Sequence, residues 1–378
     1  MAAFSQITAL FTLLLIIFSP SSSSAAKIFK KIYAFGDSFT DTGNTHSTSG
    51  PSSFTYVSNP PYGRTFFHRP TNRYSDGRLV IDFVAQALSL PFLPPYLNRK
   101  ADTSYGVNFA VAGSTAIDHR FFVENNITLD ITPQSLDTQL SWFNRYLEGV
   151  GCRDYKSTPM QCGAVFDDAL FWVGEIGAND YAYTFGSSIS PKTIQHLAVT
   201  SVSSFIQALL KKGAKYVVVE GLPTTGCLTL ALYLAPPADR DAMGCVATVN
   251  NQSHTHNAIL QSNLAAFRRG FPEATIVYAD YWNAYKSILT AAKSHGITQP
   301  FRACCGSGAG DLNFEIFATC GSPDASSCAD PSQYINWDGV HLTEAMYKAV
   351  ADKFVNGTFC HPPFSYLIRK KMASALLA

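Results

Sequence analysis

Short apolar runs that end in a glycine-bearing polar turn recur in this chain and limit the folds open to it. The first occupies residues 32–38, the second residues 106–113 and the third residues 169–174. A continuous apolar run of this length is typical of a buried strand, and glycine lets the chain turn sharply where the strand ends. We therefore predict buried strands with polar loops at their carboxyl ends.

Apolar residues at helical spacing separate these strands from two more. The spacing predicts helices over residues 79–88, 134–147, 197–212, 253–269 and 344–354, and further strands over residues 216–219 and 275–278. Strands that alternate with helices imply crossover connections and a mainly parallel sheet covered on both faces. The pattern therefore predicts an α/β fold around five strands, and open sheets of this kind bind ligands at the carboxyl ends of their strands.

Length and composition favour a single enclosed core. The chain has 378 residues, of which 47% are hydrophobic, and its formal net charge is +1. We see no internal repeat or low-complexity linker, so we predict one domain over residues 27–378. Lys and Arg residues are scattered and do not interleave with aromatic residues, so the composition gives no reason to expect a nucleic-acid partner.

The first 26 residues have the composition of a secretory signal peptide. They contain no charged side chain, and the apolar run Leu10–Phe18 precedes a Ser-rich stretch that ends at Ala26. That run is too short to anchor the chain in a bilayer, and no later segment offers ~20 uninterrupted apolar residues. We expect cleavage near Ala26 and a soluble, secreted monomer without a stable membrane anchor, found in the apoplast or another extracellular space, or in the vacuole.

Secretion makes disulfides the expected state of the nine cysteines. Two local bridges are plausible, Cys152 with Cys162 and Cys227 with Cys245. The remaining cysteines are Cys304, Cys305, Cys320, Cys328 and Cys360. The first four of these allow three pairings between which the sequence does not choose, and the odd total leaves at least one thiol unpaired or intermolecular. Zinc is the rival for the cluster, but C-x-x-C pairs are absent.

Three sequons for N-glycosylation begin at Asn126, Asn251 and Asn356. They are meaningful because the chain is expected to enter the secretory pathway.

A serine and an Asp–His pair supply the chemistry that we regard as the most informative. Ser38 follows the first strand, and Asp338 precedes His341 by three residues just before the helix for which Thr343 is a good N-cap. A carboxylate on one imidazole nitrogen leaves the other free to take the proton of a serine nucleophile. The alternative is that Asp338 and His341 only cap the last helix, and that Ser38 caps the turn after its strand.

An acyl hydrolase also needs donors for the oxyanion of its tetrahedral intermediate. Three candidates follow predicted strands: the backbone N–H groups of Ser38 and Gly113 and the side-chain amide of Asn179. The alternatives are that Gly113 only closes a turn and that Asn179 only makes an Asx-turn.

Four segments of the chain resemble the sequence blocks of the plant GDSL esterase/lipase family within the SGNH hydrolases. They are Phe35-Gly-Asp-Ser-Phe-Thr-Asp-Thr-Gly-Asn44, Asn108-Phe-Ala-Val-Ala-Gly-Ser-Thr-Ala116, Gly177-Ala-Asn-Asp180 and Asp338-Gly-Val-His341. The resemblance extends from about Lys27 to Phe359, and Phe39 replaces the Leu of the family's name, as in many plant members.

This resemblance implies a three-layer α/β/α sandwich with a flavodoxin-like sheet. It also implies that Ser38 is the nucleophile, His341 its base and Asp338 the residue that orients the base, with Ser38, Gly113 and Asn179 as the oxyanion hole.

On these grounds we expect a serine esterase or lipase that hydrolyses a small-molecule carboxylic ester and needs no cofactor or metal. The alternatives are acyl transfer to an alcohol acceptor, which would use the same residues, and a catalytically silent binding protein. A metal pair at His254 and His256 has no third ligand in view. The loops over residues 45–68 and 228–241 are expected to line the substrate pockets, but they do not identify the ester.

Overall fold

The structure is a computed structural model that describes residues 27–45, 56–127, 132–308 and 310–376. The predicted signal peptide, residues 1–26, lies outside the described residues, as do residues 46–55 of the loop 45–68 that is expected to line a substrate pocket.

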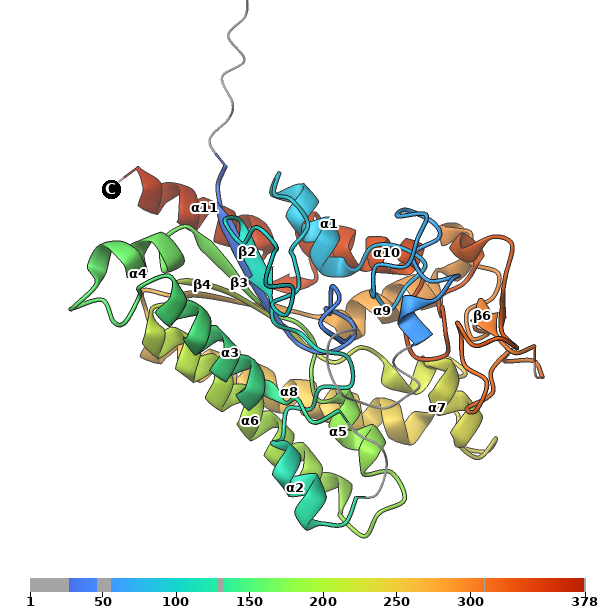
Figure 1. The fold of residues 1–378 in the computed structure, drawn as a ribbon. Helices are drawn as coiled ribbons and strands as arrows, with labels where there is room; N and C mark the ends of the chain where they lie inside the picture. The colour runs from blue at the N-terminus through green and yellow to red at the C-terminus, as the bar shows by residue number, and fades with distance from the viewer. Residues whose placement is uncertain (1–26, 46–55, 128–131, 309, 377–378) are drawn as a thin grey trace, which may run out of the picture.

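A twisted six-stranded sheet forms the centre of the molecule, in the order β2-β1-β3-β4-β5-β8 (Figure 1). Its strands are β1 (Lys31–Phe35), β2 (Gly106–Asn108), β3 (Ala169–Val173), β4 (Tyr216–Glu220), β5 (Thr275–Ala279) and β8 (Cys360–His361). The first five pair in parallel. These are the five predicted strands, and the short β8 adds an antiparallel edge next to β5.

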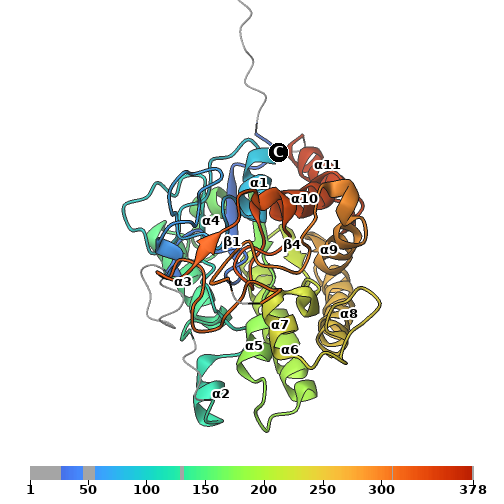
Figure 2. The same ribbon diagram turned by 90° about the vertical axis from the view of Figure 1, so that its right-hand side faces the viewer.

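Helices cover both faces of this sheet, which confirms the predicted α/β class (Figures 1 and 2). One face carries α1 (Val80–Ala87), α9 (Tyr281–Thr290), α10 (Glu344–Val355) and α11 (Phe364–Ala375). The opposite face carries α3 (Leu136–Gly149), α4 (Pro159–Phe166), α6 (Pro191–Lys212) and α8 (Ala247–Gly270). The short helices α2 (His119–Glu124), α5 (Ala178–Tyr183) and α7 (Thr229–Leu234) lie in the connections.

Alternation along the strands explains why there are two cores. In β1, Ile32 and Ala34 belong to the cluster under α1 and α10, whereas Tyr33 and Phe35 belong to the cluster under α3 and α6. All four side chains are fully buried. Because successive side chains point to opposite faces, a strand that is apolar at every position must lie between two layers of helices.

The second strand is shorter than predicted. The prediction extended it to Ala112, but β2 ends at Asn108. Beyond that residue the Phe109 and Val111 N–H groups still donate to the Ala34 and Gly36 carbonyl oxygens. Side chains bind other backbone groups of this segment: the Asn44 amide donates to the Ala110 carbonyl oxygen at 2.8 Å, and the Ala112 N–H donates to the Asp41 carboxylate at 3.0 Å.

Helix α6 begins six residues earlier than the predicted Leu197, at Pro191. The side chain of Ser190 accepts the N–H of Thr193, and Pro191 needs no hydrogen-bond acceptor at the first helical position. The predicted end is correct, since Gly213 caps the helix with φ of 112°. Thr343 caps α10 as predicted, because its hydroxyl accepts the Met346 N–H.

Four disulfides cross-link the described part of the chain. The two predicted local bridges, Cys152–Cys162 and Cys227–Cys245, are present. The cluster pairs as Cys304–Cys328 and Cys305–Cys320, which uses all four of its sulfurs, and Cys360 is a buried free thiol. A two-stranded sheet, β6 (Cys305–Gly306) with β7 (Ser326–Ser327), lies inside this cross-linked segment.

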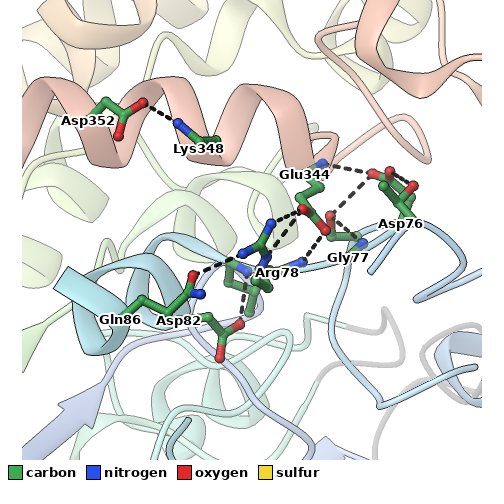
Figure 3. A network of polar contacts seen from close by, with 11 residues as sticks. Asp76, Gly77, Arg78, Asp82, Gln86, Glu344, Lys348 and Asp352 are labelled. Atoms are coloured by element: carbon green, nitrogen blue, oxygen red, sulfur yellow. Dashed lines mark hydrogen bonds and ion pairs between the residues drawn. The ribbon is translucent and has the colours of Figure 1, made fainter. Parts of the chain in front are cut away.

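A polar network joins the start of α1 to the start of α10 (Figure 3). The guanidinium group of Arg78 forms an ion pair with the carboxylate of Glu344, and the Arg78 N–H donates to the same carboxylate at 3.1 Å. The Glu344 N–H donates to Asp76 at 2.7 Å. Since Glu344 follows His341 by three residues, this network fixes the chain on one side of the imidazole.

Among the helices of the described segments, none has the length and apolar composition needed to cross a membrane.

Candidate active site

Ser38 lies in a tight turn directly after β1. The carbonyl oxygen of Asp37 accepts the N–H groups of Thr40 and Asp41, and the Asp37 carboxylate accepts that of Phe39 at 3.1 Å. Gly36 begins the turn with φ of 140°, a conformation that side chains with a Cβ rarely adopt. The turn holds the Ser38 side chain, which is 5% exposed, at the carboxyl edge of the sheet.

The structure brings together the three side chains that the sequence predicts as a triad. The Ser38 Oγ lies 2.7 Å from the His341 Nε2, across 303 residues of chain. The His341 Nδ1 lies 2.8 Å from the Asp338 Oδ2. With the proton on Nδ1, the serine hydroxyl donates to Nε2 and Nδ1–H donates to the carboxylate, which is the arrangement needed to remove the serine proton.

The Asp338 carboxylate is buried but well supplied with donors. Its Oδ1 accepts the N–H groups of Val340 and His341 at 3.0 and 2.8 Å, and its Oδ2 accepts the Tyr62 hydroxyl at 2.7 Å. Burial alone raises the pKa of Asp338, but the His341 ring and these hydrogen bonds outweigh it and lower the pKa to about 2. The carboxylate is therefore ionised at any pH at which the protein would act.

Two aromatic rings flank the imidazole. The ring centroid of Tyr74 lies 4.5 Å from that of His341, and the Phe39 centroid lies 5.6 Å away. His341 itself is 4% exposed. The rings restrict the imidazole to the plane in which it contacts Ser38 and Asp338.

The Ser38 and Gly113 N–H groups have no hydrogen-bond acceptor among the described residues. Gly113 has φ of 73°, and the Tyr183 hydroxyl donates to its carbonyl oxygen at 3.0 Å.

The side-chain amide of Asn179 is already hydrogen-bonded within the protein. Its Nδ2 lies 2.9 Å from the Asp37 Oδ2 and 3.0 Å from the Ser114 carbonyl oxygen, so both amide hydrogens are used. Asn179 lies beside the Ser38 turn as expected, but one of its hydrogen bonds must be exchanged before it can donate to an oxyanion.

Side-chain amides join the loops that carry these groups. The Asn44 Nδ2 donates to the Asn108 carbonyl oxygen at 2.9 Å, and the Asn108 Nδ2 donates to that of Thr40 at 2.6 Å. Gln139 of α3 accepts the Gly36 N–H and donates to the Gly36 carbonyl oxygen. The turns after β1 and β2 are therefore held as one unit.

A group of buried carboxyl groups beneath the Ser38 turn was missed by the sequence reasoning. Burial raises the pKa of Asp37 and Asp180 to about 7 and that of Glu220 to about 8. Burial, reinforced by the charge of Asp37, raises the pKa of Glu175 well above its ordinary value. The signal was present, since Glu175 and Glu220 each follow an apolar strand, but it predicted only another polar turn.

The remaining sequence candidates lie apart from this site. The side chains of Asn126, Asn251 and Asn356 are all exposed, so each is accessible for glycosylation. His254 packs its ring on Trp282, whereas His256 is buried against the Tyr181 hydroxyl, and burial lowers the His256 pKa to about 4. Within the described residues no group of three metal-ligating side chains includes these two.

The chain is similar to known ester hydrolases. Residues 32–354 match the family model described as GDSL-like lipase/acylhydrolase. GDSL esterase/lipase At3g48460 of Arabidopsis thaliana is 55% identical, over 97% of both chains. GDSL esterase/lipase At1g28580 of the same plant is 37% identical, over 92% of this chain and 90% of the relative.

A third relative, acetylajmalan esterase 2 of Rauvolfia serpentina, is 38% identical over 86% of this chain and 90% of its own. On these matches the chain belongs to the GDSL-like lipase/acylhydrolase family and is a carboxylic ester hydrolase.

Proposed function

We propose that the chain hydrolyses small-molecule carboxylic esters in two steps through an acyl-enzyme on Ser38. The observation that carries the proposal is the continuous chain of hydrogen bonds from the Ser38 Oγ through His341 to Asp338. An unassisted serine hydroxyl is a weak nucleophile, and a neutral imidazole within hydrogen-bond distance is the usual means of activating it.

In the first step, the His341 Nε2 takes the Ser38 proton while Oγ forms a bond to the ester carbonyl carbon. The carbonyl π electrons move onto oxygen and give a tetrahedral intermediate. When the intermediate collapses, the bond to the alcohol oxygen breaks, and that oxygen takes the proton from His341. The alcohol leaves, and the acyl group remains on Ser38. Asp338 stabilises the imidazolium that exists between the two proton transfers.

In the second step, water takes the place of the alcohol. His341 removes a proton from the water as its oxygen attacks the acyl carbon. The same nitrogen then returns the proton to the Ser38 Oγ, and the carboxylic acid is released. No proton or electron is left over, so the free enzyme is regenerated.

The negative oxygen of each intermediate needs donors that are already oriented. We assign this role to the Ser38 and Gly113 N–H groups, which lack an acceptor among the described residues, and to Asn179. Asn179 takes part by giving up its hydrogen bond to the Ser114 carbonyl oxygen and keeping the one to Asp37. The retained bond holds the amide plane beside the Ser38 turn.

We also propose that the protein is secreted as a single-domain glycoprotein over residues 27–378. Four disulfides support entry into an oxidising compartment, and the three exposed sequon asparagines support glycosylation. N-terminal sequencing of the protein exported by plant cells tests this proposal, which expects a start near Lys27. A mature chain that begins at Met1 would contradict it.

The test of the catalytic proposal is the Ser38→Ala variant with a short-chain aryl ester as substrate. We expect kcat to fall by about 10⁴-fold or more, because nothing else in the turn can form the acyl-enzyme. Ser294→Ala, at an exposed serine, is the matched control and should keep the activity of the unmodified protein. A folded Ser38→Ala protein with near-normal kcat would refute the proposal.

A further inference from the structure

Tyr62 reaches the triad from a distant part of the chain. Its hydroxyl donates to the Asp338 Oδ2 at 2.7 Å, across 276 residues of chain, and its side chain is 4% exposed. The contact is made with the oxygen that also faces the His341 Nδ1 at 2.8 Å. Tyr62 therefore meets the triad on the side of the carboxylate, away from the serine.

Packing and loop contacts hold Tyr62 in this position. Its ring lies edge-on to those of Tyr74 and Trp337, each with centroids 6.0 Å away. The segment that carries it is bound to the cross-linked cysteine segment, where the Asn59 side chain donates to the Gly321 carbonyl oxygen at 3.0 Å. Trp337 precedes Asp338 directly, so the donor and the carboxylate are fixed by the same packing.

The hydroxyl completes the set of donors on the carboxylate. The Val340 and His341 N–H groups occupy Oδ1, and the His341 Nδ1–H and the Tyr62 O–H occupy Oδ2. An ionised carboxylate has about four lone-pair sites, and each is met here. Rotation of this carboxylate would break several of its hydrogen bonds. Hydrogen bonds to an ionised oxygen are among the strongest in proteins, so the carboxylate is held in place.

We propose that Tyr62 is a positioning residue for ester hydrolysis, which holds the Asp338 carboxylate against the His341 Nδ1 and limits the charge that the imidazole experiences. This inference rests on the proposed function of the triad. Tyr62 acts through Asp338, because its hydroxyl contacts the carboxylate and not Ser38.

Two effects follow from removing the hydroxyl alone. A carboxylate with one donor fewer is less well fixed, so kcat should fall while KM changes little. The same carboxylate has a less dispersed charge and stabilises the imidazolium more strongly, so a higher pH is needed to obtain the neutral base. A purely structural role would predict lower stability but no displacement of the pH profile.

Other groups around the imidazole also influence its protonation. Asp37 faces it from the turn after β1, where the two interact electrostatically. The Tyr74 ring packs against it at a tilt, from the Tyr62 segment, and Tyr347 of α10 interacts electrostatically with Asp338. None of these groups is altered when only the Tyr62 hydroxyl is removed, so a change in the pH profile reports on that hydroxyl.

The test is the Tyr62→Phe variant, assayed with a neutral aryl ester from pH 5 to 9. We expect kcat to fall about 5- to 30-fold, KM to stay within about twofold, and the acid limb of kcat/KM to move up by about half a pH unit. Tyr285→Phe is the matched control: Tyr285 is also fully buried, its hydroxyl has no partner among the described residues, and its removal should leave the profile in place.

Two further variants distinguish a positioning role of Tyr62 from a purely structural role. In an Asp338→Asn background, Tyr62→Phe should cause no further loss of kcat, because its partner is gone. Tyr62→3-fluorotyrosine keeps the ring and supplies a stronger donor, so it should move the acid limb to lower pH even if Tyr62→Phe folds poorly. An unmoved acid limb in both Tyr62 variants would overturn the inference.

Labelling with a serine-directed phosphonate separates this inference from the function on which it rests. If Ser38 of the unmodified protein is not labelled, the triad proposal is wrong. If Ser38 is labelled and the labelling rates of the unmodified and Tyr62→Phe proteins depend on pH in the same way, only the role of Tyr62 is wrong.

Discussion

Asp338 shows how opposing physical effects set the state of a single residue. Burial disfavours its charge, yet the donors around it outweigh burial and lower its pKa to about 2. The carboxylate therefore stays ionised and can accept the hydrogen bond from the His341 Nδ1–H. Loss of activity on mild acidification is therefore assigned to protonation of the imidazole, which must be neutral to accept the serine proton.

This assignment leads to a prediction for the pH dependence. The kcat/KM for a neutral ester should rise with pH and then level off, because catalysis needs the neutral imidazole. Asp338→Asn should lower kcat by about 10⁴-fold, because an amide cannot stabilise the imidazolium and favours the wrong tautomer. Steady-state kinetics over pH 5 to 9 measure both effects. A flat profile, or an undiminished kcat in Asp338→Asn, would contradict the triad assignment.

The residues that could be predicted differ in kind from those that could not. The proximity of Ser38, Asp338 and His341 was predictable, because a serine mechanism requires these residue types together and Asp338 and His341 are close in the sequence. The contacts of Tyr62 and Glu220 were not predictable, because they join segments that only the fold brings together. The hydrogen bonds of Asn179 to Asp37 and Ser114 were not predictable either, because no local sequence pattern specifies them.

At the scale of elements, the junction of α1 and α10 determines how firmly the His341 turn is held. Arg78 and Glu344 have side chains only 16% and 10% exposed, so their ion pair is poorly screened by water. On the same helix, Lys348 and Asp352 form an ion pair whose side chains are 56% and 54% exposed (Figure 3). The two pairs differ in burial and in what they join: the Arg78 pair links two distant segments, whereas the Lys348 pair lies along one helix.

We predict that Arg78→Met lowers the free energy of unfolding by about 2 to 4 kcal/mol, because it leaves the Glu344 carboxylate shielded from water without its partner. The control, Lys348→Met, should change it by less than about 0.5 kcal/mol. Urea unfolding followed by circular dichroism measures both. Equal effects of the two substitutions would show that the Arg78 pair does not stabilise the junction.

Element prediction succeeded where the sequence pattern is local and long enough. The buried strands β1, β3, β4 and β5 were recognisable as continuous apolar runs, and α10 by its Thr343 cap. The two-residue strands β6, β7 and β8 have no pattern of their own, because pairing with a partner defines them. β2 was predicted too long because regular pairing ends at Asn108. Beyond it, hydrogen bonds to the β1 segment alternate with hydrogen bonds to the Asn44 and Asp41 side chains.

At the scale of the whole molecule, the buried carboxyl groups link stability to pH. Asp37, Asp180 and Glu220 have folded-state pKa values of about 7, 7 and 8, whereas carboxyl groups in an unfolded chain titrate near pH 4. Between these values the folded protein binds more protons than the unfolded chain. Stability is therefore greatest at the acidic end of this range and falls as the pH rises towards 8.

We predict that the Tm is about 5 °C higher at pH 5.5 than at pH 8.5, and that Glu220→Gln reduces the difference by removing one of the groups that must ionise. Glu273→Gln, at an exposed position, should leave the difference unchanged. Differential scanning calorimetry across this range measures it. A Tm that increases from pH 5.5 to 8.5 would show that these carboxyl groups do not control stability.

The fold class and the position of the site followed from the alternation of elements, because parallel strands bring their carboxyl ends to one edge. The pairing of Cys304 with Cys328 and of Cys305 with Cys320 did not follow, since it depends on how the chain crosses itself between residues 306 and 327. The identity of the physiological ester could not be predicted either, because it depends on the combined shape of several loops.

Direct detection of the acyl-enzyme is the sharpest test of the central claim. The protein is mixed with one equivalent of a slowly deacylating aryl ester such as p-nitrophenyl trimethylacetate, quenched in acid and mapped by mass spectrometry. We predict release of about one equivalent of nitrophenol and a trimethylacetyl group on the peptide that contains Ser38, with neither in Ser38→Ala. An acyl group on another residue of the unmodified protein, or ester turnover by Ser38→Ala at the normal rate, would contradict the account.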